Sequence, residues 1–137
     1  MKRQIFLTYR SEPLPRWRET FFAAEIQAYP MPGTVLASIP GTAVIWLHVQ
    51  AETMNLSEGI SRASASAPGC PVVVLSNIPN NEEGLAALAA GASGYCSALA
   101  TPAVLRQVGS VVGQGGLWVG QELMRRGEEL FRRAQAG

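Results

Sequence analysis

Few of the side chains that usually carry enzyme chemistry are present in this chain. Among its 137 residues, His48 is the only histidine, Lys2 is the only lysine, all ten acidic residues are glutamates, and aspartate is absent. A mechanism that needs an aspartate is therefore excluded, and sites built from paired histidines or a Ser-His-Asp triad lack their residues. His48 could accept a phosphoryl group on nitrogen, but its context favours a hydrogen-bonded histidine at the end of a strand.

The two cysteines, Cys70 and Cys96, lie in unrelated apolar segments and are not spaced as a CxxC pair. Their context favours reduced, packed thiols. No evident base, orienting acid or metal cluster accompanies them, so an enzyme that uses these thiols or His48 is the least favoured function. The sequence predicts a protein without enzymatic activity and without a metal or cofactor.

The charge pattern does not favour a nucleic acid or a membrane as partner. The formal net charge is +1, and charged residues make up only 15% of the chain, against about 25% in a typical soluble domain. Such a surface suggests partial cover by a protein partner. Residues 26–51 and 84–105 hold no charged side chain, but prolines and glycines interrupt both, so neither predicts a membrane span. The apolar run near the start is too short for a secretory signal, and we expect a cytoplasmic protein.

Apolar runs typical of strands alternate with segments of helical periodicity. Strands are expected at residues 4–8, 26–29, 42–49, 71–76 and 93–97. Among the intervening helices, one is predicted to open with a capping box at Asn80 and Glu83, and one with an N-cap and proline at Thr101 and Pro102. Residues 31–41 leave room for only one or two turns between prolines and glycines, so the second helix is expected to be eroded.

This alternation predicts an α/β fold of the flavodoxin-like, doubly wound type, with five parallel strands and helices on both faces. In such a sheet the functional crevice lies beyond the carboxyl ends of the strands, where the strand order reverses. The residues expected at this crevice are Thr8, Tyr9, His48, Ser76, Asn77 and the loop 97–100.

The second half of the chain contains several motifs in a characteristic order. Residues 71–77 read PVVVLSN and are followed by a predicted helix and then by GASGY. Residues 101–126, TPAVLRQVGSVVGQGGLWVGQELMRR, add a further helix and a short connector. In this order the motifs resemble the receiver domain of two-component response regulators of the NarL/LuxR type, which implies a CheY-like fold.

The resemblance implies a receiver-like domain over residues 1–116 and a connector helix or tail over residues 117–137. A DNA-binding output domain commonly follows in that family and is expected to be absent from this chain, so no direct DNA binding is predicted. The chain is then either a fragment of a longer transcription regulator or a free-standing regulatory domain. The mixed charges of the last segment favour a solvated connector over a DNA-reading helix.

The same resemblance indicates that the phosphorylation pocket is altered. Thr8 and Tyr9 stand where a receiver has the acidic pair that binds Mg²⁺. His48 stands at the phosphoacceptor aspartate, and Ala98 stands at the lysine. Only the hydroxyl of Ser76 remains from the phosphate-binding set. We therefore expect a degenerate pseudo-receiver that is not phosphorylated.

The resemblance also implies a route for signalling. In the family, a hydroxyl on the fourth strand and an aromatic residue on the fifth move together, which makes Ser76 and Tyr95 a candidate switch pair. A serine that ends a strand and a tyrosine that packs its ring explain the two residues equally well. Small side chains on the fourth helix predict a surface for a homodimer or a protein partner, formed by helix 4, strand 5 and helix 5. The residues assigned to it are Leu85, Leu88, Ala89 and Arg106.

Two hypotheses for the function follow. The leading one is an atypical response-regulator receiver domain in signal transduction or transcription regulation, which acts by phosphorylation-independent dimerisation or partner docking. The alternative keeps the fold but binds a small ligand in the altered pocket, with His48, Ser76 and Asn77 as polar contacts.

Overall fold

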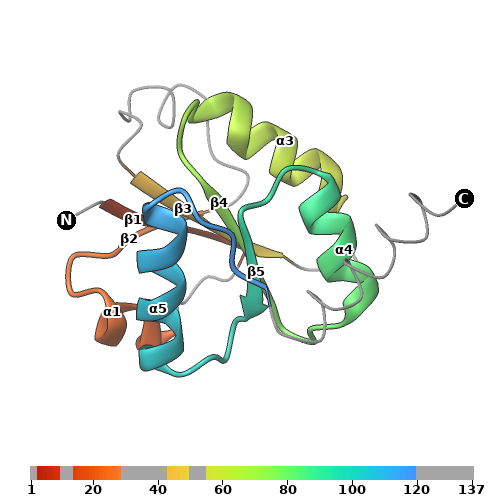
Figure 1. The fold of residues 1–137 in the computed structure, drawn as a ribbon. Helices are drawn as coiled ribbons and strands as arrows, with labels where there is room; N and C mark the ends of the chain where they lie inside the picture. The colour runs from red at the N-terminus through yellow and green to blue at the C-terminus, as the bar shows by residue number, and fades with distance from the viewer. Residues whose placement is uncertain (1–2, 10–13, 29–42, 50–54, 120–137) are drawn as a thin grey trace, which may run out of the picture.

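The computed structural model describes residues 3–9, 14–28, 43–49 and 55–119, which form a parallel sheet with helices on both faces (Figure 1). Within these ranges the sheet has five strands in the order β2-β1-β3-β4-β5. The strands are β1 (Arg3–Thr8), β2 (Glu25–Ala28), β3 (Ala43–Val49), β4 (Val72–Ser76) and β5 (Gly94–Ser97). All neighbouring strands run parallel, so the predicted doubly wound, flavodoxin-like fold is confirmed.

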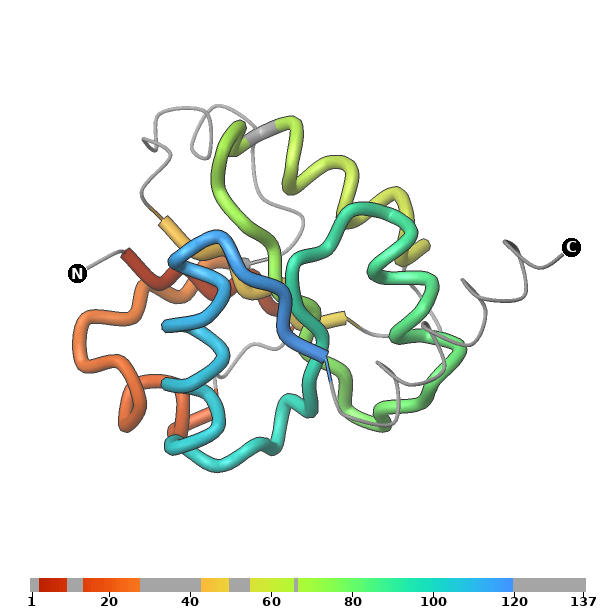
Figure 2. Tube along the Cα trace, in the orientation of Figure 1, coloured from red at the N-terminus to blue at the C-terminus, as the bar shows by residue number. Residues whose placement is uncertain are grey.

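Four helices in the described part of the chain cover the sheet. They are α1 (Pro15–Thr20), α3 (Leu56–Ser66), α4 (Asn81–Ala89) and α5 (Pro102–Gly113). The helices α1 and α5 lie together on one face, and α3 and α4 lie on the other (Figures 1 and 2). None of these helices is long and apolar enough to cross a membrane. The eroded second helix predicted within residues 31–41 falls outside the described residues.

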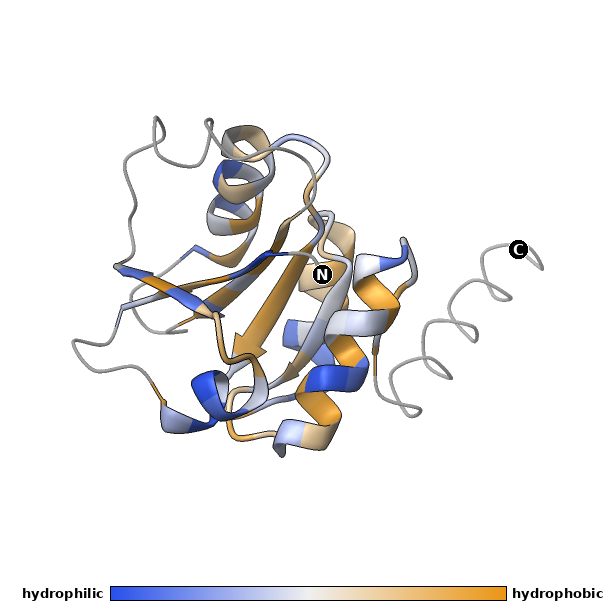
Figure 3. Cartoon of the chain, turned by 90° about the vertical axis from the view of Figure 1, so that its left-hand side faces the viewer, coloured by the Kyte–Doolittle hydropathy of each residue, from blue (hydrophilic) through white to orange (hydrophobic). Residues whose placement is uncertain are grey.

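The central strand β3 explains why the sequence shows an uninterrupted apolar run there. All seven of its residues are buried, as expected for a parallel strand covered on both faces. Val44 and Trp46 pack in the layer under α1 and α5, whereas Ile45 and Leu47 pack under α3 and α4. The hydrophobic central strands therefore lie between two layers of helices in which hydrophilic and hydrophobic residues are mixed (Figure 3).

The layer under α1 and α5 is built from aromatic rings. Phe6 stacks on Trp17 of α1 with 4.8 Å between ring centroids, and on Trp46 of β3 with 5.2 Å. Phe21, which follows α1, packs against Trp46 at 5.6 Å. Aromatic pairs of this kind contribute about 0.5–1.5 kcal/mol each beyond their burial. These contacts hold α1 in place although the helix has only six residues.

The predicted starts of α4 and α5 are confirmed by their caps. The side chain of Asn80 accepts a hydrogen bond from the Glu83 backbone N–H at 2.8 Å, and that of Thr101 accepts one from Val104 at 3.3 Å. Each cap satisfies a backbone donor that has no partner within the helix.

The outer edge of β5 is covered by residues that the sequence assigns to the connector. Trp118 pairs in parallel with Gly94; its backbone N–H donates to Ser93 O at 3.0 Å, and its carbonyl accepts from Tyr95 N at 3.1 Å. The segment 117–119 thus satisfies backbone groups that an edge strand would otherwise expose. Residues 120–137, the rest of the predicted connector, lie outside the described part of the chain.

Candidate functional site

The candidate site lies at the carboxyl ends of β1, β3 and β4. The strand order reverses between β1 and β3, because β2 lies beyond β1 on one side and β4 beyond β3 on the other. The register pairs Thr8 of β1 with His48 of β3, and Val49 with Ser76 of β4. This edge is where doubly wound sheets place their functional crevice.

The structure joins four of the predicted site residues in one chain of hydrogen bonds. The hydroxyl of Thr8 lies 3.0 Å from His48 Nδ1, and His48 Nε2 lies 2.7 Å from Asn77 Oδ1. The amide nitrogen of Asn77 donates to the hydroxyl of Tyr9 at 2.6 Å. Both ring nitrogens of His48 therefore have partners. Because the amide oxygen of Asn77 can only accept, His48 Nε2 donates to it.

The imidazole of His48 is enclosed as well as hydrogen-bonded. The residue is fully buried. The ring of Tyr9 covers it at 4.8 Å between centroids, and Trp17 meets it edge-on at 5.3 Å. A group that reacts at either nitrogen would have to displace a hydrogen-bond partner inside this enclosure. The geometry is that of a structural histidine that ties three strand ends together.

The described residues at this edge do not gather ligands for a hard cation. Among the described residues, no three or more His, Cys, Asp or Glu side chains gather closely enough to hold a metal ion. The positions of the receiver's acidic pair carry the hydroxyls of Thr8 and Tyr9, and both groups take part in the His48 network. Mg²⁺ prefers carboxylates, which this edge does not supply at those two positions.

Tyr95 points into the molecule and is bonded to the start of α4. Its hydroxyl donates to Glu83 Oε1 at 2.7 Å and accepts from the Asn80 backbone N–H at 3.0 Å. Burial and the bond to Glu83 raise the pKa of Tyr95 to about 12, against an opposing effect of the Asn80 and Ser76 hydrogen bonds. The predicted switch pair is thus brought together, but the main partner of Tyr95 is a carboxylate.

The sequence prediction missed this role of Glu83. The residue is visible in the sequence only as half of a capping box, a pattern in which its side chain would bond back to Asn80. In the structure the Tyr95 hydroxyl lies between Asn80 and Glu83. It accepts a hydrogen bond from the Asn80 backbone N–H and donates one to the Glu83 carboxylate.

The loop after β5 contains no side chain that could neutralise an anion. Ala98, at the position of the receiver's lysine, is fully buried, and its N–H donates to Ser76 O at 2.8 Å. The sequence prediction missed Arg16 of α1, whose guanidinium donates to the carbonyls of Leu99 and Ala100. A cation therefore reaches this loop, but it serves to fasten α1 to the loop backbone.

The residues assigned to the interface do not share one face. Leu85 and Leu88 of α4 are half-buried and pack on the core beside α3, while Ala89 is exposed. Arg106 lies on the side of α5 that faces α1, where it lines a groove with Phe21. The structure thus keeps three of the four residues on α4 and places Arg106 apart from them.

The cysteines have the environment of packed thiols. Cys70 is buried, Cys96 is half-buried, and no disulfide joins the two. Burial raises the pKa of Cys96 to about 12. The thiolate, which is the reactive form, is therefore scarce at neutral pH.

Comparison with known proteins supports the fold. No protein-family model matches the sequence, and a search of curated proteins finds no match either. Solved structures do match. The chain is similar to the response regulator DrrB from Thermotoga maritima, an OmpR/PhoB homologue, with a TM-score of 0.62 and 18% identity. This match covers 85% of the present chain but only 55% of DrrB.

Two further structures extend the likeness. A LuxR family two-component response regulator from Aurantimonas has a TM-score of 0.63 at 15% identity, with 90% of this chain and 93% of that one covered. A putative pilus assembly-related protein from Burkholderia pseudomallei has a TM-score of 0.64 at 12% identity, with 85% and 92% covered. At such identities the likeness concerns the fold, which proteins with different functions can share.

Proposed function

We propose that this protein is a receiver-like signalling domain that works without phosphoryl transfer. Its fold is similar to that of response regulators. The observation that carries the proposal is the closed hydrogen-bond chain of Thr8, His48, Asn77 and Tyr9. This chain occupies the edge of the sheet where a receiver would bind Mg²⁺ and accept phosphate.

The chemistry of phosphoryl transfer explains why this network excludes it. Transfer depends on a metal ion and a cation that neutralise charge on the phosphoryl oxygens. Here two hydroxyls replace the acidic pair, and Ala98 replaces the lysine. His48 is buried with both nitrogens hydrogen-bonded, so it cannot accept a phosphoryl group without breaking the network. The domain is accordingly regulatory and non-enzymatic.

The output surface we propose is the α4 side of the molecule, continuing over β5 and α5. On α4, Ala86 and Ala89 are exposed, and their small side chains permit close approach of another backbone. The segment 117–119 already pairs with β5, so a partner would contact side chains and not add a strand. A homodimer and a different docking protein both satisfy this geometry.

The proposal places the protein in the cytoplasm and assigns DNA binding to none of its elements. Any role in transcription regulation would pass through a partner or an output domain. The alternative function, a small ligand held by His48, Ser76 and Asn77, gains no support from the contacts, because the polar groups of His48 and Asn77 bond to each other.

The absence of phosphoryl transfer can be tested by mass spectrometry. The protein is incubated with acetyl phosphate and Mg²⁺, beside a receiver domain with an intact aspartate as positive control, and the intact mass is recorded. We expect the parent and His48→Gln to keep their masses under conditions that modify the control. A stoichiometric phosphoryl adduct on the parent that is lost in His48→Gln would contradict the proposal.

The output surface can be tested with one charge on α4. Ala89→Glu places a carboxylate on the exposed face of α4, and Ala65→Glu does the same on α3 as the matched control. Light scattering on the protein alone and with its isolated partner should show loss of association for Ala89→Glu and retention for Ala65→Glu. Equal association of both variants would place the interface elsewhere.

A further inference from the structure

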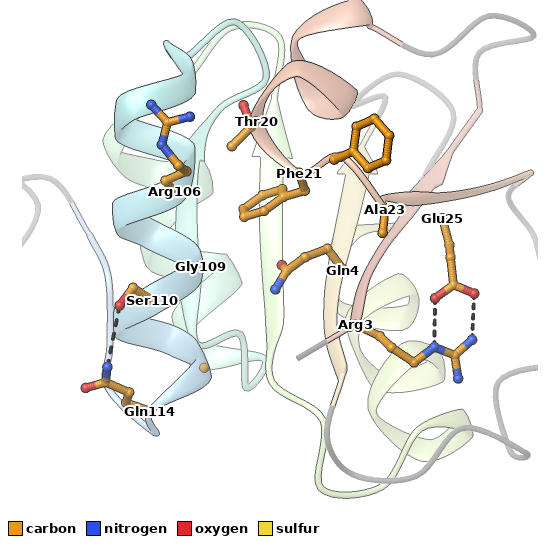
Figure 4. A pocket seen from close by; sticks show the side chains of 12 residues that line it. Arg3, Gln4, Thr20, Phe21, Ala23, Glu25, Arg106, Gly109, Ser110 and Gln114 are labelled. Atoms are coloured by element: carbon orange, nitrogen blue, oxygen red, sulfur yellow. Dashed lines mark hydrogen bonds and ion pairs between the residues drawn. The ribbon is translucent and has the colours of Figure 1, made fainter. Parts of the chain in front are cut away.

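A second concave surface, with no residue of the His48 network in its lining, lies between α5 and the connection from α1 to β2. It is a groove of about 840 Å³, within the range of about 300–1,000 Å³ that small-molecule sites occupy. One wall is α5, and the other is the segment after α1 together with β2 (Figure 4). The residues that the argument uses are Arg3, Phe21, Phe22, Arg106, Gly109 and Ser110.

The groove exists because α5 turns small residues toward α1. Gly109, Ser110 and Gly113 follow Arg106 at intervals of three, four and seven residues, which places them on one side of the helix. A Cβ on Gly109 would stand only 3.0 Å from the ring of Phe21. Phe21 is held in turn by Trp46 and Phe6. The inner wall is therefore formed by packed core residues before any ligand binds.

The described residues of the groove include one cation, Arg106, to which none of them supplies a counter-ion. Arg3 forms a two-pronged ion pair with Glu25, with N–O distances of 2.6 and 2.7 Å, which holds the pKa of Glu25 below its usual range. Arg106 forms no ion pair with any described residue. Figure 4 shows it on α5 at the end near Thr20, away from the Arg3–Glu25 pair. The lining thus carries a net charge of one positive unit, located at one end.

An exposed aromatic residue lies beside the same groove. Phe22 is 98% exposed and contributes to its lining. Its ring adds exposed apolar surface to that wall of the groove. The groove thus combines an apolar track, an exposed aromatic ring and a guanidinium that has no counter-ion among the described residues.

We propose that this groove binds a medium-chain alkyl monocarboxylate. The carboxylate pairs with Arg106, since a guanidinium matches its two oxygens in a planar, bidentate geometry. The alkyl chain lies along the side of α5 that carries Ser110 and Gly113, against the outer surface of the Phe21 ring, which itself covers Gly109. From Arg106 to Gly113 the helix advances about 10 Å, which suits an extended chain. This site does not depend on the function proposed for the carboxyl edge.

The proposal is tested by calorimetric titration of the full chain with octanoate, octanol and acetate. Octanoate is expected to bind, whereas octanol lacks the charge and acetate lacks the chain, so both should bind at least tenfold more weakly. Arg106→Gln should weaken octanoate binding about tenfold, the effect of losing one charged hydrogen-bond partner. Arg62→Gln, on exposed α3, is the control and should leave binding unchanged.

A second pair of variants tests the position of the alkyl chain. Ser110→Phe fills the groove from an exposed position and should abolish octanoate binding, while Gln107→Phe adds the same ring to α5 outside the groove and should not. Circular dichroism confirms that each variant is folded. The proposal is overturned if octanoate does not bind the parent, if octanol binds equally well, or if Ser110→Phe retains binding. Loss of self-association in Ser110→Phe, without octanoate binding to the parent, would instead identify the groove as a protein interface.

Discussion

The carboxyl edge of the sheet and the groove beside α5 differ in how fully their polar groups are satisfied. At the edge, the unusual residue types are bonded to one another: His48 to Thr8 and Asn77, and Tyr95 to Glu83. In the groove, the residues are ordinary, but Arg106 has no described counter-ion and Phe22 is exposed. A rare residue type is therefore a poor guide to a binding site when its hydrogen-bonding capacity is already filled.

The largest expected effect is on stability at the edge. His48→Ala removes a buried ring and leaves Thr8 and Asn77 without their shared partner, so we expect the free energy of unfolding to fall by about 3 kcal/mol. Urea denaturation measures this change. A decrease in the free energy of unfolding of less than about 1 kcal/mol would mean that the network does not hold the strand ends together. The edge would then not differ from the groove in its contribution to stability.

The edge should also respond to alkaline pH through Tyr95. The pKa of Tyr95 is about 12 when folded, against about 10 for an unperturbed tyrosine. A raised pKa means that its contribution to stability is complete below pH 10 and is lost as the pH rises from about 10 to 12. Cys96 contributes with the same sign. The measurement is therefore the difference in urea midpoint between the parent and Tyr95→Phe across this range, and a gap that does not change with pH would refute the assignment.

A smaller effect is expected where the network reaches the surface. Asn77 is exposed, so in Asn77→Ala a water molecule can take its place at His48 Nε2. We expect a loss of about 1 kcal/mol in urea denaturation. A loss as large as that of His48→Ala would show that Asn77 holds the loop after β4 by more than this bond.

The smallest effect on stability should come from the groove. Arg106→Gln and Ser110→Phe alter exposed side chains that form no ion pair with a described residue, so each should change the free energy of unfolding by less than about 0.5 kcal/mol. The same urea series provides the values. Changes above about 2 kcal/mol would give the groove a structural role and remove the distinction between the two regions.

The prediction of the fold rested on local patterns that tertiary packing did not override. The apolar run of residues 42–49 was predicted as a buried strand because it is rich in β-branched residues, and the structure has a buried strand over residues 43–49. The Asn80 and Thr101 caps mark helix starts by chemistry confined to three residues. The site was predictable in location, because the ends of parallel strands meet at one edge. Its bonding was not, since Thr8, His48 and Asn77 are separated by 40 and 29 residues.

Other contacts left no signal in the sequence. Arg16 reaches carbonyl groups on residues 83 and 84 positions away, and backbone carbonyls are the same at every residue. Trp118 pairs with β5 through its main chain, and the type of its side chain does not predict this pairing. Arg106 was predicted as part of a surface formed by helix 4, strand 5 and helix 5, and sequence order could not tell that it also lines the groove beside α1.

The sequence by itself determined which chemistries this protein lacks and which elements it forms, because residue types and periodicity are local properties. Without aspartate at the strand ends, no arrangement of the chain can rebuild an aspartate phosphoacceptor. Only the tertiary structure decided how the remaining polar groups are used. It enclosed His48 among hydroxyl, amide and aromatic groups and left Arg106 beside an apolar groove, since satisfaction of hydrogen bonds and charges depends on residues brought together from distant parts of the chain.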